Sequence, residues 1–218
     1  MDVFVTLIHG LNLAAIYALM AIGISLLWSS IGMINMAHGA SFAVSGYAAW
    51  VVSAAMKPVL LAAFGKTVIG TAAMAGVTLL TGTAAGAAMG ALIYGLAFLP
   101  IHDKPNFPVR SLIVTLAINL ATVQALLWYF GPQQKNLPKI FGTGKVDLGP
   151  ISARYDQIGA ILSTAVILGL VLFWLKVSRK GLEIRAMMQN PEGAVLSGIS
   201  VRWTALPVTM LTGALAGL

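Results

Sequence analysis

The first 56 residues carry one long apolar pattern that is interrupted once. Asp, Glu, Lys and Arg are absent between Asp2 and Lys57. This run is too long for a single membrane crossing, which needs about 20 apolar residues, but it is long enough for two. The segment IGMINMAHG, residues 31–39, lies in its middle. The pattern therefore predicts two membrane helices, at 3–29 and 31–56, that meet at a polar segment.

The rest of the chain repeats this alternation of apolar runs and short polar connections. Further apolar runs cover 67–99, 111–131 and 158–177, and a last one begins near 203. None shows the period-2 alternation of a membrane strand, so we expect helices. The third run exceeds one untilted crossing, which leaves open one long tilted helix or a helix plus a re-entrant piece.

These runs predict an all-α, polytopic transmembrane helical bundle that forms one domain over residues 1–218. The connections at 57–66, 100–110 and 132–157 hold Pro, Gly and charged residues, and we expect loops there. The last ten residues end inside an apolar run with no polar flank. We therefore expect the chain to be an N-terminal fragment of a longer bundle.

Composition supports a membrane protein. The chain is 59% hydrophobic and 9% charged, whereas soluble domains are roughly 25% charged. The net charge of +7 comes from residues in the short connections, which favours contact with membrane lipid over binding of nucleic acid. The absence of cysteine excludes disulfides and thiolate metal sites.

The polar segment in the first apolar pattern is the first candidate site. Asn35, His38 and Ser41 lie there beside two glycines, Gly32 and Gly39. Polar groups inside a membrane are costly unless they line a cavity or pack against protein. Lining a transport pathway and joining two helices are both open interpretations, and for His38 they are evenly balanced.

The chain lacks the side chains that an enzyme or an ion-driven carrier would place in the membrane. All six acids lie outside the apolar runs, and the three histidines are too scattered for a metal site. The sequence Gly65-Lys66-Thr67 resembles the end of a P-loop, but position 60 is Leu rather than Gly. We expect no catalysis, no metal and no cofactor. The sequence indicates a membrane pathway that is either passive or driven by a partner.

Three glycines in the third run, Gly82, Gly86 and Gly90, lie four residues apart on one helix face. Such a stripe permits close helix approach. It fits a pore-lining or dimer contact, but we favour helix packing within one bundle.

Residues 178–202 form the most charged stretch with helical character. We expect Arg179 and Lys180 to close the fifth helix and Gly181 to break it, followed by a short helix at 182–189.

A second short helix is predicted directly afterwards. Asn190, Pro191 and Glu192 read as an N-cap, a first-position proline and an acid in the first turn. This helix covers about 191–197 and ends at Gly198. The two short helices either stand out of the bilayer as a docking element or lie at its surface.

The residues themselves resemble one known family. HGLNLAAIYALMAIGISLLWSSIGMINMAHG, residues 9–39, followed by Gly46-Tyr47, resembles the permease subunits of bacterial branched-chain amino acid ABC importers. The segments 111–131 and 179–199 are similar too. The resemblance covers nearly the whole chain, and family members have roughly eight helices and continue beyond position 218.

The resemblance implies a bacterial inner-membrane permease without enzymatic activity. It would transport branched-chain or other hydrophobic amino acids by alternating access. The implied partners are a second homologous permease subunit, two cytoplasmic ATPase subunits and a periplasmic substrate-binding protein. Residues 178–202 would form a cytoplasmic coupling loop that docks on an ATPase.

Glu192, Ala194 and Gly198 match the E-x-A-x-x-x-G part of the family's coupling motif, although position 193 is Gly where a second Ala is usual. The candidate ATPase contacts are Glu183, Arg185, Asn190, Pro191, Glu192, Ala194 and Gly198.

The candidate pathway residues are Asn35, His38, Gly39, Ser41, Thr115 and Asn119. Thr115 and Asn119 are four apart and can share a helix face, although hydrogen bonding between helices is an equally good interpretation.

One departure from the family bears on the substrate. Relatives often carry an acid directly after the His-Gly pair, and position 40 here is Ala. A permease for urea or short-chain amides is therefore an alternative, as are a passive channel, a secondary carrier and a non-transporting scaffold.

Overall fold

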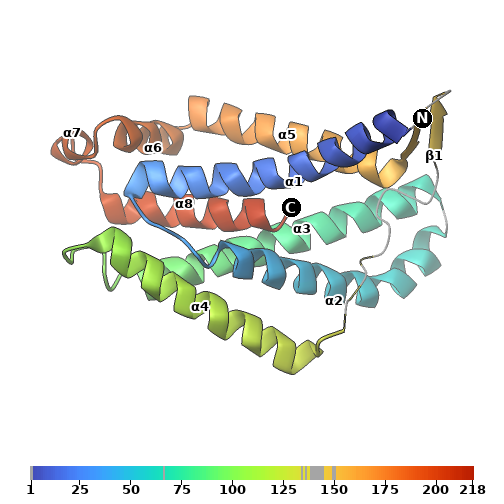
Figure 1. The fold of residues 1–218 in the computed structure, drawn as a ribbon, viewed down its shortest axis with the longest axis horizontal. Coiled ribbons are helices and arrows are strands. Elements are labelled where there is room, and N and C mark those ends of the chain that lie inside the picture. Colours follow the sequence, from blue (N-terminus) through green and yellow to red (C-terminus); the bar gives the residue numbers. More distant parts are fainter. Residues whose placement is uncertain (1, 66, 134, 136, 138–144, 149–150) are drawn as a thin grey trace.

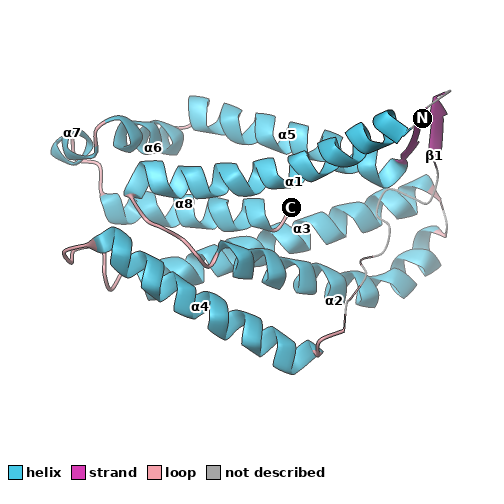
Figure 2. Ribbon diagram, viewed as in Figure 1, coloured by secondary structure: helices cyan, strands magenta, loops and turns pink. Residues whose placement is uncertain are grey.

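The computed structural model describes residues 2–65, 67–133, 135, 137, 145–148 and 151–218. It is a bundle of helices with one small hairpin (Figure 2). The helices are α1 Asp2–Ile31, α2 His38–Phe64, α3 Val68–Ile93, the π-helical turn η1 Tyr94–Phe98, α4 Phe107–Phe130, α5 Tyr155–Val177, α6 Arg179–Gln189, α7 Pro191–Leu196 and α8 Val201–Ala216. The predicted all-α class is confirmed.

Five of these helices are long and apolar enough to cross a membrane. They are Thr6–Ile31, His38–Phe64, Ile69–Phe98, Phe107–Phe130 and Gln157–Val177. The chain is therefore a multi-pass membrane protein, as the apolar runs predicted.

Three connections differ from those expected. The predicted loop at 57–66 is wrong, because α2 continues through Lys57 and Pro58 to Phe64. A proline is tolerated inside a membrane helix where neighbouring groups satisfy the freed backbone carbonyl. The long third run is one continuous helical segment, in which α3 passes directly into η1.

The expected loop at 100–110 is also too long, since α4 begins at Phe107 with Pro108 in its first turn. Within the expected loop at 132–157, β1 Lys145–Leu148 pairs antiparallel with β2 Ile151–Arg154. Residues 134, 136, 138–144 and 149–150 of that loop lie outside the described part of the chain.

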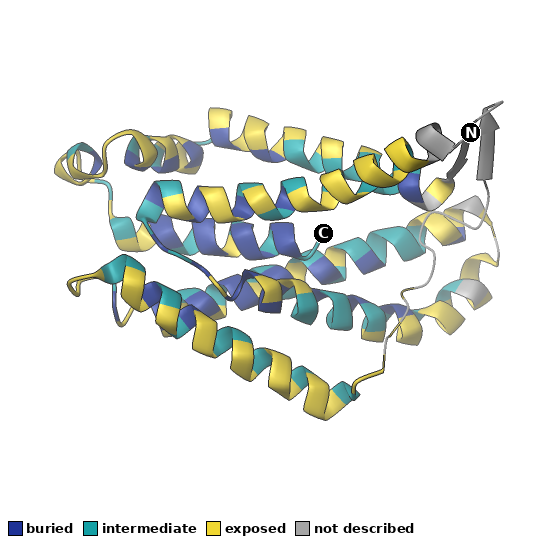
Figure 3. Cartoon of the chain, in the orientation of Figure 1, coloured by how far each residue is buried: buried dark blue, intermediate teal, exposed yellow. Residues whose placement is uncertain are grey.

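The buried core follows α8, which lies between α1 and α3 (Figures 1 and 3). Its buried residues include Ala205, Val208, Thr212 and Leu215. In contrast, α4 lies on the outer side of α2 and is mostly exposed along its length (Figure 3). Such exposed apolar side chains suit contact with lipid or with another membrane helix.

The glycine stripe of α3 faces α8. A Cβ atom added to Gly86 or Gly90 would overlap a backbone carbonyl oxygen of α8, from Gly213 and Thr209 respectively, and one added to Gly82 would overlap that of Gly217, the C-cap of α8. The stripe therefore brings two antiparallel helix backbones into direct contact within one chain.

Candidate functional site

The polar break, defined here as residues 32–37, separates α1 from α2. The chain leaves α1 through Gly32 at φ +65°, a left-handed conformation that suits glycine. It then runs back along the bundle before α2 begins (Figure 1). The ring of His38, the first residue of α2, lies 3.0 Å from the position of a Cβ atom on Gly23. Gly23 is eight residues before the end of α1, about 12 Å along its axis, so α2 begins well inside the bundle.

The backbone of the polar break is satisfied by side chains of α4. The N–H of Ile34 donates to Ser111 Oγ at 3.1 Å, and the N–H of Met36 donates to Thr115 Oγ1 at 2.9 Å. Both hydroxyl residues are completely buried. These bonds replace those that the interrupted helix cannot make, which an unwound segment requires at membrane depth.

Asn35 completes this local arrangement. Its Oδ1 accepts the N–H of Ala37 at 2.9 Å, directly before α2 starts, and the residue is 8% exposed. Asn35 therefore contributes to the start of α2 rather than facing an open surface.

His38 is buried without a hydrogen-bond partner. The residue is 3% exposed, and neither ring nitrogen is paired with any described residue. The ring lies against Gly23 of α1. Thr212 of α8 also lies against Gly23, and its hydroxyl donates to the Gly23 carbonyl at 3.2 Å. A buried unpaired polar group costs free energy, so this position is unfavourable for a purely structural histidine.

The first turn of α2 has no side-chain cap among the described residues. None of the side-chain hydrogen bonds in the described part of the chain goes to the backbone N–H of His38, Gly39 or Ala40, and the turn at Met36 and Ala37 leads directly into the helix. The end of a helix that carries such groups is partially positive. Because position 40 is Ala, no side-chain carboxylate is adjacent to neutralise it.

The predicted pathway residues fall into two groups. Gly39 is exposed, and Asn119 Oδ1 lies 3.8 Å from the position of a Cβ atom on it. Ser41 is completely buried and its hydroxyl donates to the Ala37 carbonyl. Thus Gly39 and half-buried Asn119 lie at an accessible surface, whereas Asn35, His38, Ser41 and Thr115 do not.

The accessible side of α2 continues away from Gly39 to a cavity of about 350 Å³. Phe42, Gly46, Tyr47 and Trp50 line it together with Lys135, whose Nζ lies 5.3 Å from the centre of the Trp50 ring. This surface was not predicted as a site from the sequence, although residues 39, 42, 46 and 50 recur at helical spacing.

The two short helices at 178–202, called the coupling segment below, have regular caps. Ser178 Oγ accepts the N–H of Gly181 at 2.8 Å, and Asn190 Oδ1 accepts the N–H of Gly193 at 3.0 Å. Pro191 occupies the first turn of α7, as the sequence predicted.

Two expectations for this segment are wrong. Arg179 and Lys180 begin α6 instead of closing α5, because Ser178 acts as an N-cap. Gly181 does not break a helix. It is buried in α6, where a Cβ atom would overlap the Leu175 backbone, so it permits close approach of α6 to α5.

Besides Asn190, two further predicted ATPase contacts make side-chain bonds within the chain. Glu183 accepts from Lys180 Nζ at 2.8 Å and from the Thr204 hydroxyl at 3.3 Å. Arg185 donates to the Lys176 carbonyl at 3.0 Å. These bonds link α6 to its neighbours α8 and α5.

The exposed residues of the coupling segment include most of α7. Glu192 is exposed and Ala194 is buried. Gly198 ends the helix at φ +87°, which favours glycine. The apolar side chains Val195 and Leu196 are 50% and 89% exposed. Neither residue was predicted from the sequence. Two adjacent exposed apolar side chains outside the long apolar helices indicate a contact surface.

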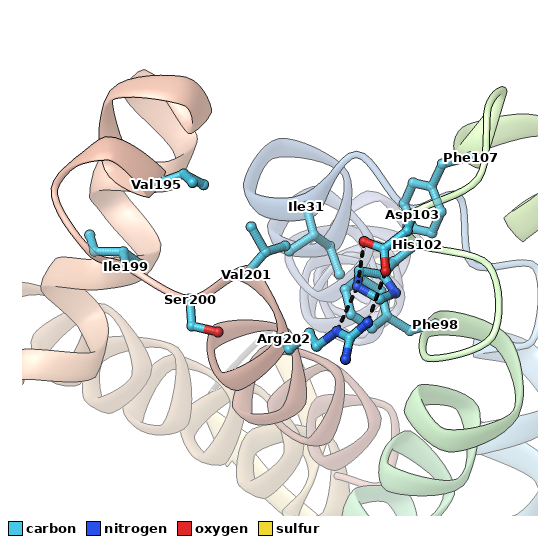
Figure 4. Close-up of a pocket in the computed structure, with 10 residues that line it drawn as sticks. All are labelled: Ile31, Phe98, His102, Asp103, Phe107, Val195, Ile199, Ser200, Val201 and Arg202. Carbon is cyan, nitrogen blue, oxygen red and sulfur yellow. Dashed lines mark hydrogen bonds and ion pairs between the residues drawn. The ribbon is translucent and has the colours of Figure 1, made fainter.

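A charged contact joins the coupling segment to the connection between η1 and α4 (Figure 4). Arg202 donates through Nη2 to Asp103 Oδ2 and through Nε to His102 Nε2, both at 2.8 Å. The Tyr94 hydroxyl donates to the Arg202 carbonyl at 3.1 Å. Arg202, His102 and Asp103 border a cavity of about 400 Å³, whose apolar walls include Phe107. No local sequence pattern predicts these long-range contacts.

The long apolar helices define a polytopic membrane protein. Its first two helices, α1 and α2, are separated by a non-helical segment whose backbone N–H groups are bonded by side chains of α4. The family model described as "Branched-chain amino acid transport system / permease component" matches residues 6–218. The chain belongs to this family of transport permeases.

Individual relatives are more distant. The chain is 25% identical to the high-affinity branched-chain amino acid transport system permease protein BraD of Pseudomonas aeruginosa, over 95% of this chain and 66% of that protein. It is 24% identical to LivH of Escherichia coli K12, over 94% of this chain and 65% of that protein. A probable LivH of Methanocaldococcus jannaschii is 32% identical over 61% of this chain and 42% of that protein. The chain thus spans just under two thirds of the first two relatives. No solved structure matches it.

Proposed function

We propose that this chain is a membrane-spanning permease subunit of an ATP-driven importer for branched-chain and related apolar amino acids. The observation that carries the proposal is the family match over residues 6–218, on a chain whose polar break lies at membrane depth. The complete importer would contain a second homologous permease subunit, two cytoplasmic ATPase subunits and a periplasmic binding protein. It would work in the bacterial inner membrane.

The accessible side of α2 is the proposed substrate pathway in this subunit. Gly39 and Asn119 lie at its inner end, at the first turn of α2. A helix start inside a membrane suits the carboxylate of an amino acid, because the backbone N–H groups of a first helical turn and the helix dipole favour an anion. The apolar walls at Phe42 and Trp50 suit an apolar side chain.

The coupling segment is the proposed contact with an ATPase. It lies at the end of the bundle where α1 ends and α4 starts, with α6 beside the last part of α1 and α7 further out (Figure 1). Val195 and Leu196 offer an apolar surface beside the carboxylate of Glu192. Movement of an ATPase against α7 would tilt the attached helices and switch access to the pathway.

Uptake of labelled leucine tests the function. We expect uptake in membrane vesicles that contain the chain and its three kinds of partner, and loss of uptake when the ATPases cannot hydrolyse ATP. Uptake that persists without hydrolysis would identify a channel or a secondary carrier. Transport of urea or acetamide with no leucine uptake would identify an amide permease.

Co-purification tests the docking surface. Glu192→Lys reverses an exposed charge and should weaken ATPase binding while the membrane fold persists. Lys104→Gln changes an exposed charge in the connection before α4 and is the matched control. Normal recovery of the ATPase with Glu192→Lys would refute the assignment of Glu192 to the docking surface.

A further inference from the structure

Two sets of polar contacts, one after the other, connect the coupling segment to the polar break. In the first, Arg202 at the start of α8 binds His102 and Asp103. In the second, Ser111 and Thr115 of α4 bind the backbone of the polar break. The short stretch from 103 to 115 connects the two sets and contains the first two turns of α4.

We propose that Ser111 and Thr115 are positioning residues for transport, which make the polar break move with α4, while the Arg202 contact makes α4 move with the coupling segment. The inference rests on the proposed function and extends it. It gives a route by which an ATPase movement would reach the start of α2.

The hydroxyl contacts are built to persist during such a movement. Ser111 and Thr115 are four residues apart, so they share one face of α4, and both are completely buried where water does not compete. Thr115 Oγ1 lies 2.7 Å from the Ser111 carbonyl, which can accept its hydrogen. Its lone pairs therefore remain available to the Met36 N–H.

The Arg202 contact contains hydrogen bonds in addition to its ion pair with Asp103. An exposed ion pair alone contributes little to stability. Arg202, however, is held by its side chain at two consecutive residues and by its carbonyl at Tyr94. The ring of His102 in turn stacks on Phe98 at 5.0 Å. The side chain of Arg202 is thus fixed to the connection that leads into α4, and its backbone is fixed to η1, which precedes that connection.

The experiment uses the complete importer in proteoliposomes, with cysteine-free partner subunits. This chain has no cysteine, so Met36→Cys introduces a single thiol at a residue that is 46% exposed. We expect the rate of maleimide labelling at this thiol to change when ATP and vanadate are added. A second readout is the amount of leucine transported per ATP hydrolysed.

Thr115→Val and Ser111→Ala should each reduce the ATP-dependent change in labelling and the leucine transported per ATP. The expected reduction is roughly two- to tenfold, the change in equilibrium that corresponds to one lost hydrogen bond. ATP hydrolysis itself should be preserved. Thr115→Ser keeps the hydroxyl and should restore both readouts, whereas Thr122→Val, two turns further along α4, should change neither.

The Arg202 contact is tested by exchange of charge. Arg202→Asp alone should reduce both readouts, and Arg202→Asp with Asp103→Arg should restore them partly. A full response to ATP in folded Thr115→Val and Ser111→Ala proteins would overturn the inference. If Thr115→Val does not fold, Ser111→Ala decides. Absence of leucine transport by the parent importer, with ATP-dependent labelling intact, would reject the proposed substrate and leave the positioning role standing.

Discussion

The helices α3 and α4 are attached to the rest of the bundle in different ways. The backbone of α3 contacts that of α8 through Gly82, Gly86 and Gly90, with no side chain between them. In contrast, α4 is joined near its start by two hydroxyl groups, is mostly exposed along its length (Figure 3), and meets α2 again at its last residue, where Phe130 stacks on Tyr47 at 4.4 Å. Backbone contact depends on many short-range interactions that fail together when the spacing changes. A few hydrogen bonds can follow a tilt of the helix that carries them.

This difference indicates which part of the bundle deforms. The pair α3–α8 is expected to stay rigid, because any shift along the glycine stripe produces backbone overlap. Movement is expected at α4 and the polar break, where polar contacts define the geometry. The coupling segment precedes α8 directly in the chain, so it connects to both parts.

The largest change in the free energy of unfolding is expected at the contact between α3 and α8. Gly86→Ala places a methyl group against the Gly213 backbone, which cannot move aside as a side chain can. We expect a loss of about 1–3 kcal/mol in the free energy of unfolding, measured by thermal unfolding in detergent. Gly76→Ala is the matched control on the same helix. Its added methyl meets open space, so a gain of about 0.5–1 kcal/mol is expected. An equal change in unfolding free energy in the two variants would show that close backbone contact does not hold α3 and α8 together.

A smaller change in the free energy of unfolding, opposite in sign to that of Gly86→Ala, is expected at the start of α2. His38→Leu removes two unpaired buried nitrogens, so stability should be unchanged or higher by about 1 kcal/mol. Leucine transport should nevertheless fall, because the histidine lies beside the proposed pathway. Thermal unfolding and uptake are measured on the same preparation. A parallel loss of both would mean that His38 serves packing alone.

The smallest effect is expected at the far end of α4. Trp128 is 86% exposed, and Trp128→Ala should change the unfolding free energy of this chain by less than about 0.5 kcal/mol. If Trp128→Ala prevents assembly with a second permease subunit but leaves the stability of the isolated chain unchanged, α4 lies at the subunit interface. It would then differ from α3, which packs within the chain. A large loss of stability would show that α4 is as firmly packed as α3.

The sequence predicted the helical class and most of the helices because apolar length is a local property. The errors arose where tertiary context overrides local signals. Pro58 and Lys57 suggested a loop, yet α2 continues through them. Gly181 suggested a helix end, yet it serves close packing. The caps at Asn190 and Pro191 were predictable, since capping depends on neighbouring residues only.

The candidate site was predictable in position but less so in detail. The polar residues at 35–41 marked the interruption between α1 and α2. Their division into exposed Gly39 and buried Asn35, His38 and Ser41 depends on packing against α4 and α8, which no local pattern encodes. Ser111 carried one usable signal, since a second hydroxyl four residues before Thr115 in an apolar run indicates a shared partner. The Arg202 contact with Asp103 joins residues 99 positions apart and had none.

The hydroxyl contacts to the polar break also bear on how the protein is made. Ile34 and Met36 emerge from the ribosome well before Ser111 and Thr115, which are separated from them by 77 and 79 positions. Until α4 is synthesised, the N–H groups of the break have no α4 acceptors, and leaving them bare in lipid would cost several kcal/mol each. The α1–α2 hairpin is therefore expected to remain beside water or the insertion machinery until the fourth long helix arrives. Its release into lipid would be a late event in synthesis, timed by a helix that follows it in the chain.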